Sequence, residues 1–417
     1  MPRMLLILIP LLAAALGCQQ EETPAPKNAE DVINALQDLG YAGGVQSDGE
    51  SGVVVRDAER MQPGYTLVSI HRLSMAKLID EEGTTVHEWR LEGSRHWDNV
   101  ELLDNGDILT TGADPYPTKG IRDEKRYALR MSWDGEVIWK RYLTAHHDIT
   151  EAPGGGFLTL TFQRRKAPEI HPTVDLRDDQ ITRLDDDGRP VASISMYDLT
   201  RDNDLFPFRR KRPVEKGGRE WVDLFHCNSV EPMTHEELFG THRLFAAEHV
   251  LVCSRHQNRI AIVDTKARAL VWAWGRGELD GPHDATLLGN GNILVFDNGL
   301  FRGWSRVLEI DPRTGRIVWK YEHPDDVGRP RDAPGKHFYT GSKGSNQRLA
   351  NGNTLICNSD NGEVFEVTPD GAVVWRWLCD EEFDDPQRPR ESLRATLVRA
   401  YRYDREFIDR LRERHGE

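Results

Sequence analysis

Short apolar runs recur along the chain in pairs, and a turn rich in Gly and Asn joins the two runs of each pair. Four such pairs align well: "VELLDNGDILTTG" (100–112), "ITEAPGGGFLTLT" (149–161), "ATLLGNGNILVFD" (285–297) and "QRLANGNTLICNS" (347–359). Turn residues of these types accept a positive φ, as tight hairpin loops require. The pattern therefore predicts a β-hairpin in each segment.

A second, weaker hairpin follows and ends in tryptophan, as in "SWDGEVIWKR" and "TPDGAVVWRW". The tryptophan markers are Trp89, Trp139, Trp272, Trp319 and Trp375, and one unit without its Trp lies near 188–196. Neighbouring markers lie about 50 residues apart, which is typical of the four-stranded repeats of β-propellers. We therefore predict an all-β, six-bladed β-propeller over residues 60–378. An unrelated set of hairpins in a sandwich is the alternative.

The N-terminus has the features of an export signal. Residues 1–17 contain an apolar run too short for a comfortable membrane span, and small residues precede Cys18. The stretch "ALGC" (15–18) resembles a bacterial lipobox, so we expect a signal peptide over 1–17 and a lipid anchor on Cys18. Cleavage by signal peptidase I, or a plain N-terminal anchor, is the alternative. In each case we expect an exported protein; with the lipid on Cys18 it is a periplasmic protein held at the cell envelope membrane.

Three further segments lie outside the repeat. Residues 19–59 are expected to form a polar tether, and the apolar spacing in 379–417 predicts a C-terminal helical extension on the flank of the propeller. The insertion 197–225 shows neither strand nor helix periodicity. We interpret it as a lid or wall over one face, with a solvated excursion as the alternative.

Charge and cysteine content limit the classes of partner. The chain has 54 Lys and Arg against 68 Asp and Glu, a formal net charge of −14, which argues against a nucleic-acid groove. Apart from Cys18, the cysteines show no metal-ligand spacing. They could pair in an oxidising compartment, and their connectivity stays open. They are Cys227, Cys253, Cys357 and Cys379.

Histidines occupy one repeat position in three consecutive blades. His147 and His283 precede their hairpin turns by the same distance, and His226 opens the first strand of the fourth blade in the same way. Blades two and six have Asp98 and Gly344 at this position. The first strand of each blade lines the central channel of a propeller, so we expect the three histidines to converge at one mouth of that channel.

Arg255 is expected to join them, because the second strand of the fourth blade returns antiparallel and ends beside His226. A guanidinium fork with several imidazoles suits the oxygens of a sulfate or phosphate group, and a neutral imidazole is a nucleophile toward such a group. One alternative is that the histidines are structural. Another is a three-histidine zinc site, which the charge of Arg255 opposes and for which only Asp148 and Asp284 offer nearby carboxylates.

These residues also carry a family resemblance. The stretches "HHD" (146–148), "HCNS" (226–229), "CSR" (253–255), "PHDATLLGNGNILVFDNG" (282–299) and "QRLANGNTLICNSDNGEVFEVTPDGAVVW" (347–375) resemble those of bacterial arylsulfotransferases. These exported six-bladed propellers move a sulfuryl group from one phenol to another. The resemblance implies small-molecule aryl sulfates and phenols as partners, no nucleotide, and no metal or other cofactor. It leaves the oligomeric state open.

The resemblance also implies roles for individual residues. His283 is the nucleophile that becomes sulfated, and His147, His226 and Arg255 hold the equatorial sulfuryl oxygens, with Asn228 beside the substrate. His147 is the first choice for the general acid. Two other functions remain as alternatives: a hydrolase of sulfate or phosphate esters, and a non-catalytic envelope lipoprotein whose propeller binds partner proteins.

Overall fold

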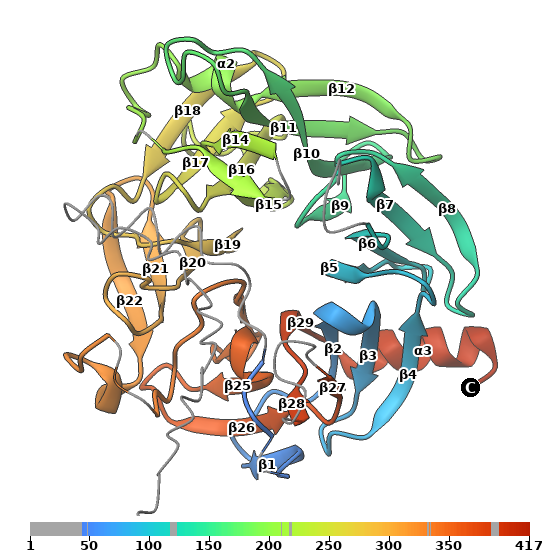
Figure 1. The fold of residues 1–417 in the computed structure, drawn as a ribbon. Coiled ribbons are helices and arrows are strands. Elements are labelled where there is room, and N and C mark those ends of the chain that lie inside the picture. The colour runs from blue at the N-terminus through green and yellow to red at the C-terminus, as the bar shows by residue number, and fades with distance from the viewer. Residues whose placement is uncertain are drawn as a thin grey trace, which may run out of the picture.

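The computed structural model shows six β-sheets arranged around one axis, as Figure 1 illustrates. The predicted six-bladed propeller is therefore confirmed. The structure describes residues 44–47, 49–116, 123–209, 211–216, 219–331, 333, 335–384 and 392–417. The expected signal peptide, Cys18 and most of the expected tether lie outside this range. Among the described helices, none combines the length and the apolarity needed to cross a bilayer.

Each blade has four antiparallel strands, which follow one another from the axis outward. The first three blades are β29 (Leu397–Tyr403), β2 (Tyr65–Ile70), β3 (Met75–Ile79), β4 (Thr85–Arg90); β5 (His96–Leu102), β6 (Ile108–Ala113), β7 (Arg126–Met131), β8 (Val137–Tyr142); and β9 (Ile149–Glu151), β10 (Phe157–Arg165), β11 (Leu176–Leu184), β12 (Pro190–Ser195). The other three are β15 (Cys227–Pro232), β16 (His249–Ser254), β17 (Arg259–Asp264), β18 (Ala269–Trp274); β19 (His283–Leu287), β20 (Ile293–Asp297), β21 (Arg306–Asp311), β22 (Arg316–Glu322); and β23 (Ser345–Arg348), β24 (Thr354–Asn358), β25 (Glu363–Val367), β26 (Val373–Leu378). Short 3₁₀ helices interrupt the loops: η1 (His71–Leu73), η2 (Asp123–Lys125), η3 (Glu236–Leu238), η4 (Pro324–Asp326) and η5 (Ser359–Asn361).

Segments from both ends of the chain complete blades, which corrects the expected domain boundaries. Strand β29 is the innermost strand of blade 1, and β1 (Gly52–Arg56) adds a fifth, outermost strand to blade 6. The propeller thus extends beyond 60–378 on both sides, into the expected tether and the expected helical extension. Residues 397–403 form a strand because they pair with β2, whose edge would otherwise be left open.

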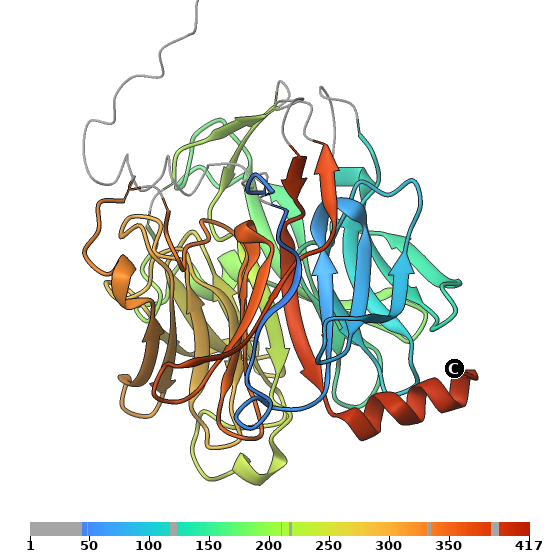
Figure 2. The ribbon, with the colours of Figure 1, turned by 90° about the horizontal axis from the view of Figure 1, so that it is seen from below.

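The helix expected at the C-terminus exists but is shorter than the sequence pattern predicts. Helix α3 (Arg405–His415) buries Ile408 and Leu411 against the core shared by blades 1 and 2, and the His415 ring stacks on Trp133 at 5.3 Å. Figure 2 shows α3 along one face of the propeller, while the hairpin of β27 (Glu382–Asp384) and β28 (Ser392–Arg394) rises on the opposite face.

The described residues of the insertion 197–225 form regular structure next to blade 3, although the sequence there shows neither strand nor helix periodicity. The segment includes most of α2 (Met196–Thr200) and all of β13 (Val214–Lys216) and β14 (Arg219–Asp223). Its interpretation as a lid or wall stays a prediction. Strand β14 pairs parallel with β11, and the buried Phe206 packs in the core of blades 3 and 4. The pairing with an existing sheet edge stabilises a strand whose own sequence is polar.

The repeated tryptophans join neighbouring blades. The indole N–H of Trp139 donates to the carbonyl of Asp186 at 3.0 Å, and that of Trp319 donates to Pro369 at 2.9 Å; both acceptors lie in the outer hairpin of the next blade. The same kind of bond links Trp89 to Ser132 and Trp375 to Glu81. In blade 4 it is made by Trp274, which bonds Gly315, rather than by the predicted marker Trp272. An indole N–H that is removed from water needs such an acceptor, which explains why tryptophan recurs at this place in the repeat.

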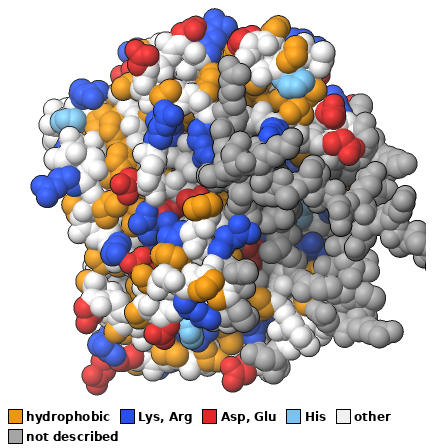
Figure 3. Space-filling view, turned by 60° about the vertical axis from the view of Figure 1, so that its left-hand side comes forward, with side chains coloured by type: hydrophobic (Ala, Val, Ile, Leu, Met, Phe, Trp, Pro, Cys, Tyr) orange, Lys and Arg blue, Asp and Glu red, His pale blue; other side chains and the backbone are white. Residues whose placement is uncertain are grey.

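The described part of the surface in Figure 3 is mixed in character, and the described cysteines are not cross-linked. In Figure 3, acidic, basic and apolar side chains are interspersed across the part of the surface that is described. Cys227, Cys253, Cys357 and Cys379 are buried free thiols, so the pairing that the sequence left open is absent among them. Burial raises the pKa of the Cys227 and Cys253 thiols well above the ordinary value, which makes them unreactive.

Candidate active site

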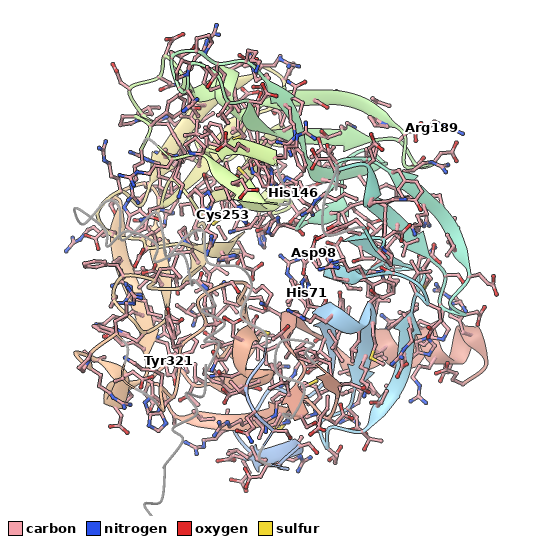
Figure 4. All side chains as sticks on the ribbon, viewed as in Figure 1. His71, Asp98, His146, Arg189, Cys253 and Tyr321 are labelled. Atoms are coloured by element: carbon pink, nitrogen blue, oxygen red, sulfur yellow. The ribbon has the colours of Figure 1, made fainter. Side chains whose placement is uncertain are left out.

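The three sequence-predicted histidines lie at the inner ends of consecutive blades. His226 directly precedes β15, His147 lies two residues before the start of β9, and His283 is the first residue of β19. We call the channel opening that they surround the histidine mouth. His147 and His226 adopt positive φ angles of 64° and 48°, a strained backbone for residues with a Cβ that is often found at functional sites. Figure 4 shows the neighbouring Asp98 and His146 close to the propeller axis and Arg189 far out at the rim.

His283 is held as a neutral imidazole with a defined tautomer. Its Nδ1 lies 2.7 Å from Oδ1 of Asn298, and the Asn298 amide nitrogen donates to the carbonyls of Thr340 and Lys343 at 2.9 and 2.8 Å. The amide oxygen must therefore accept the Nδ1–H of His283, and Nε2 keeps its lone pair. Burial and the Arg255 charge hold the pKa of His283 well below its ordinary value. The result is an uncharged, oriented imidazole.

Arg255 lies where the antiparallel pairing predicts. It follows β16, and its backbone N–H donates to the carbonyl of His226 at 3.2 Å. Its guanidinium donates from Nη1 to Nε2 of His256 at 3.2 Å and from Nη2 to the carbonyl of Gly341 at 3.4 Å. These contacts fix the plane of a buried cation beside His283.

His226 forms a dyad with a carboxylate that the sequence pattern did not reveal. Its Nδ1 lies 2.7 Å from Oδ2 of Asp223, at the end of β14. Burial opposes ionisation of Asp223, but Arg177, His226 and His256 outweigh it and hold its pKa well below the ordinary value. Burial lowers the pKa of His226, and Asp223 offsets part of that shift. The carboxylate stabilises the imidazolium whenever His226 takes up a proton.

His147 is paired with the histidine that precedes it. The Nδ1 atoms of His146 and His147 lie 2.7 Å apart, so one ring donates to the other. Nε2 of His146 lies 3.6 Å from Oδ1 of Asp179. Burial raises the pKa of Asp179, which Arg177 partly opposes. Burial holds the pKa of both histidines well below the ordinary value, helped by the charge of Arg177 at His146 and by the imidazoles of His226 and His146 at His147. The three groups form a chain along which a proton can be held.

Arg177 is a second buried cation near the histidines, and sequence reasoning missed it. It lies on β11, 3.3 Å from Asp179 and 3.5 Å from Asp223, with its guanidinium 4.2 Å from the centre of the Phe162 ring. It therefore connects the carboxylates behind His146 and His226. No repeat position marks this residue, because it belongs to the insertion-bearing blade 3, which departs from the other units.

The family assignment rests on a sequence comparison. The family model of arylsulfotransferase (ASST) matches residues 122–380. The chain belongs to the arylsulfotransferase family. A search of curated proteins found no match.

Several solved structures are also similar. One is a protein of unknown function from Bacteroides caccae, which is 15% identical with a TM-score of 0.44 and covers 81% of this chain and 100% of that one. Another is a catalytically inactive virginiamycin B lyase from Staphylococcus aureus with quinupristin, which is 11% identical with a TM-score of 0.42 over 80% and 87% of the chains.

Asn228 of this arylsulfotransferase family member connects two blades. Its Nδ2 donates to the carbonyl of Pro282 at 2.8 Å, directly before His283. Asn228 therefore helps to position the start of β19, which carries His283. Contact with a substrate stays a prediction.

The far side of the histidine mouth carries further basic groups. Lys343 has a positive φ of 60° and donates from Nζ to Asp360 at 2.8 Å. Burial and the charges of His96 and Lys343 lower the pKa of His71, whose ring lies 4.8 Å from that of His96. Cations and imidazoles from several blades thus lie near one another at this end of the propeller axis, an arrangement that favours an anion.

Two groups of potential metal ligands occur among the described residues, and neither is the set of three histidines considered from sequence. Asp223, His226 and His256 converge at the histidine mouth, but Arg177 and Arg255 both contact this group, and their charges oppose a cation. His323, Asp326 and His337 converge on the outer loop. The rings of His323 and His337 stack with an angle of 14° between their planes, whereas a metal approaches an imidazole in the plane of its ring. Arg329 also lies 3.5 Å from Asp326, and its charge opposes a cation.

Proposed function

We propose that the protein transfers a sulfuryl group from an aryl sulfate to a phenol through a sulfohistidine at His283. Membership of the arylsulfotransferase family supports the reaction class. The observation that carries the proposal is the His283–Asn298 contact, because it leaves Nε2 unprotonated beside Arg255. Since an aryl sulfate ester is itself the donor, the proposed reaction needs no nucleotide.

In the first half-reaction, Nε2 of His283 attacks the sulfur atom of the aryl sulfate. The S–N bond forms as the S–O bond to the aryl group breaks, and the electron pair of that bond leaves with the phenolate. Arg255 offsets the charge on the non-bridging oxygens. Burial lowers the pKa of His226 in the free protein, so this residue adds to the effect only when the bound anion and Asp223 together favour its protonated form. As in phosphoryl transfer, positioning and electrostatic stabilisation supply most of the catalysis.

His147 is the proposed general acid for the leaving phenolate. When His146 donates its Nδ1–H to Nδ1 of His147, the proton of neutral His147 must lie on Nε2, from which it can pass to the phenolate oxygen. In the second half-reaction the same atom takes the proton of the acceptor phenol. The phenol oxygen then attacks the sulfur atom and releases neutral His283.

We also propose export to the periplasm with a lipid anchor at Cys18, from the lipobox-like sequence alone. Loss of the lipid anchor in Cys18→Ser would release the protein from membranes into the soluble fraction. Retention of that variant on membranes at the wild-type level would contradict the anchor.

A chromogenic aryl sulfate, supplied with and without a phenol, tests the activity. Acceptor-dependent release of the chromophore is the expected result. Release without an acceptor indicates a hydrolase, and no release with any aryl sulfate favours the binding scaffold. His283→Ala should abolish release, whereas the matched control His249→Gln, a buried histidine in blade 4 that bonds the carbonyl of Leu244, should retain it.

The covalent intermediate is tested by mass spectrometry of the protein after rapid, acid-free quenching with donor alone. A peptide containing His283 should gain the mass of one SO₃. The same label found on His147 or His226 would assign the nucleophile to another blade and contradict the proposed role of His283.

A further inference from the structure

Below the histidine mouth, a single polar network takes one residue from each of the six blades. From blade 1 to blade 6 its members are Arg399, Asn99, Asp148, Val230, Asp284 and Asn346. Arg399 lies on β29, the strand that the C-terminus contributes to blade 1. We call this set the axial network.

Two aspartates in the axial network receive contacts from the other members. Nη2 of Arg399 lies 2.5 Å from Oδ1 of Asp284, and Nη1 lies 3.7 Å from Oδ1 of Asp148. The side chain of Asn99 donates to Asp148 at 2.7 Å, and the backbone of Val230 donates to it at 2.9 Å. The backbone N–H of Asn346 donates to Asp284 at 2.7 Å.

Arg399 is the cation that compensates for a group of buried acids. The network borders a cavity of about 330 Å³ that Glu101 and Glu231 also line, and Arg399 is the one basic residue among the described residues of its wall. Burial raises the pKa of Asp148 and Glu231, and raises that of Glu101 to about 7; in each case Arg399 opposes the shift. Without the guanidinium, the negative charge of these buried carboxyl groups would lack a compensating cation, which is costly.

The two aspartates connect Arg399 to the histidines through the chain itself. Asp148 directly follows His147, and Asp284 directly follows His283. The backbone is strained at one member of each pair, with φ values of 64° at His147 and 47° at Asp284. A strained backbone persists only where its surroundings hold it, and here the contacts of the aspartate carboxylates do so.

We infer that Arg399 is a positioning residue of the histidine mouth: through Asp284 and Asp148 it holds His283 and His147 at the separation that sulfuryl transfer requires. The inference rests on the proposed function. Arg399 lies outside residues 122–380, which the family model matches, and the pairing of β29 with β2 brings it to the axis.

The test removes the Arg399 side chain by substitution and then supplies its positive charge as free guanidinium ion. Arg399→Ala is expected to lower kcat by about 10²-fold, because small displacements of reacting groups have effects of this size. Added guanidinium ion should restore part of the rate by entering the cavity. The matched control is Arg402→Ala, on the same strand and also buried, whose partner is Glu366 on the other face of the blade. Guanidinium should not restore any rate that this variant loses.

A spectroscopic readout separates this inference from the proposed activity. In ¹⁵N-histidine-labelled protein, the Nδ1–H of His283 bound to Asn298 should give a downfield proton signal, assigned by its loss in His283→Gln. The signal should shift in Arg399→Ala and stay in place in Arg402→Ala. An unchanged histidine spectrum in Arg399→Ala would overturn the inference, whatever the rate. If the wild-type protein turns over no aryl sulfate, the proposed function fails, and the spectrum still decides the role of Arg399.

Discussion

Nδ1 of His283 and Oδ1 of Asn298 lie 2.7 Å apart, and the Asn298 amide is itself fixed by two backbone carbonyls. This contact decides which ring nitrogen is available for chemistry. A histidine whose other nitrogen faces an acceptor has one tautomer and one orientation, which is the condition for attack by Nε2.

Asn298→Ala should therefore lower kcat by about 10- to 100-fold, the range for groups that orient a functional imidazole, with a smaller change in KM. Asn353→Ala is the control, since Asn353 is equally buried and bonds Arg60 and Glu366 far from the histidines. Steady-state kinetics with an aryl sulfate give both constants. An equal loss of kcat in the two variants would mean that lower stability, rather than the loss of tautomer control at His283, accounts for the effect.

Arg255→Lys keeps the positive charge but removes the planar fork. If both prongs contact sulfuryl oxygens in the transition state, transfer should slow by about 10²-fold or more. The surface substitution Arg313→Lys in blade 5, where the guanidinium bonds Asp311, should leave the rate unchanged. Single-turnover measurement of chromophore release distinguishes them, and a wild-type rate in Arg255→Lys would exclude the two-pronged contact.

The acid limb of kcat/KM should lie below the ordinary histidine pKa of about 6.5. Burial and Arg255 hold the pKa of His283 well below that value, so its neutral form persists as the pH falls through 6.5, and activity is lost only at more acidic pH. Removing the cation in Arg255→Ala favours the protonated imidazole, so the limb should move to higher pH. Initial rates across pH, with circular dichroism to confirm folding, test this. A limb that moves to lower pH would contradict the assignment.

Activity should survive treatment with EDTA followed by dialysis, because two guanidinium groups adjoin the ligand group of Asp223, His226 and His256. Chromophore release before and after chelation measures this. Loss of turnover that added zinc restores would instead support a metal site at the histidine mouth.

Sequence periodicity predicted the blades because each repeat must bury its faces against its neighbours, and the same register placed His147, His226, His283 and Arg255 together. It could not reveal Asp223 or Arg177, because these belong to the irregular blade 3 and reach the site through the pairing of β14 with β11. Asn298 lies within the motif "DNG" but had no role in the sequence-based prediction, since the geometry around its amide depends on carbonyls of the following loop.

The C-terminal strand was mistaken for helix for a related reason. Residues 397–403 have no hairpin partner next to them in sequence; their partner β2 lies more than three hundred residues earlier along the chain. A local pattern contains no information on such a pairing. The contact between Arg399 and Asp284 was hidden from sequence reasoning in the same way.

The donation of β29 to blade 1 also determines when the protein becomes complete during its synthesis. A nascent chain that has not yet reached Leu397 contains every histidine of the mouth, but β2 is still an open edge and the axial aspartates have no guanidinium between them. Blades 2 to 5 can form in order of translation, whereas blade 1 is complete only once residues 397–403 have been made. The ordered histidine mouth is therefore expected to appear in one late step, after β29 has paired with β2.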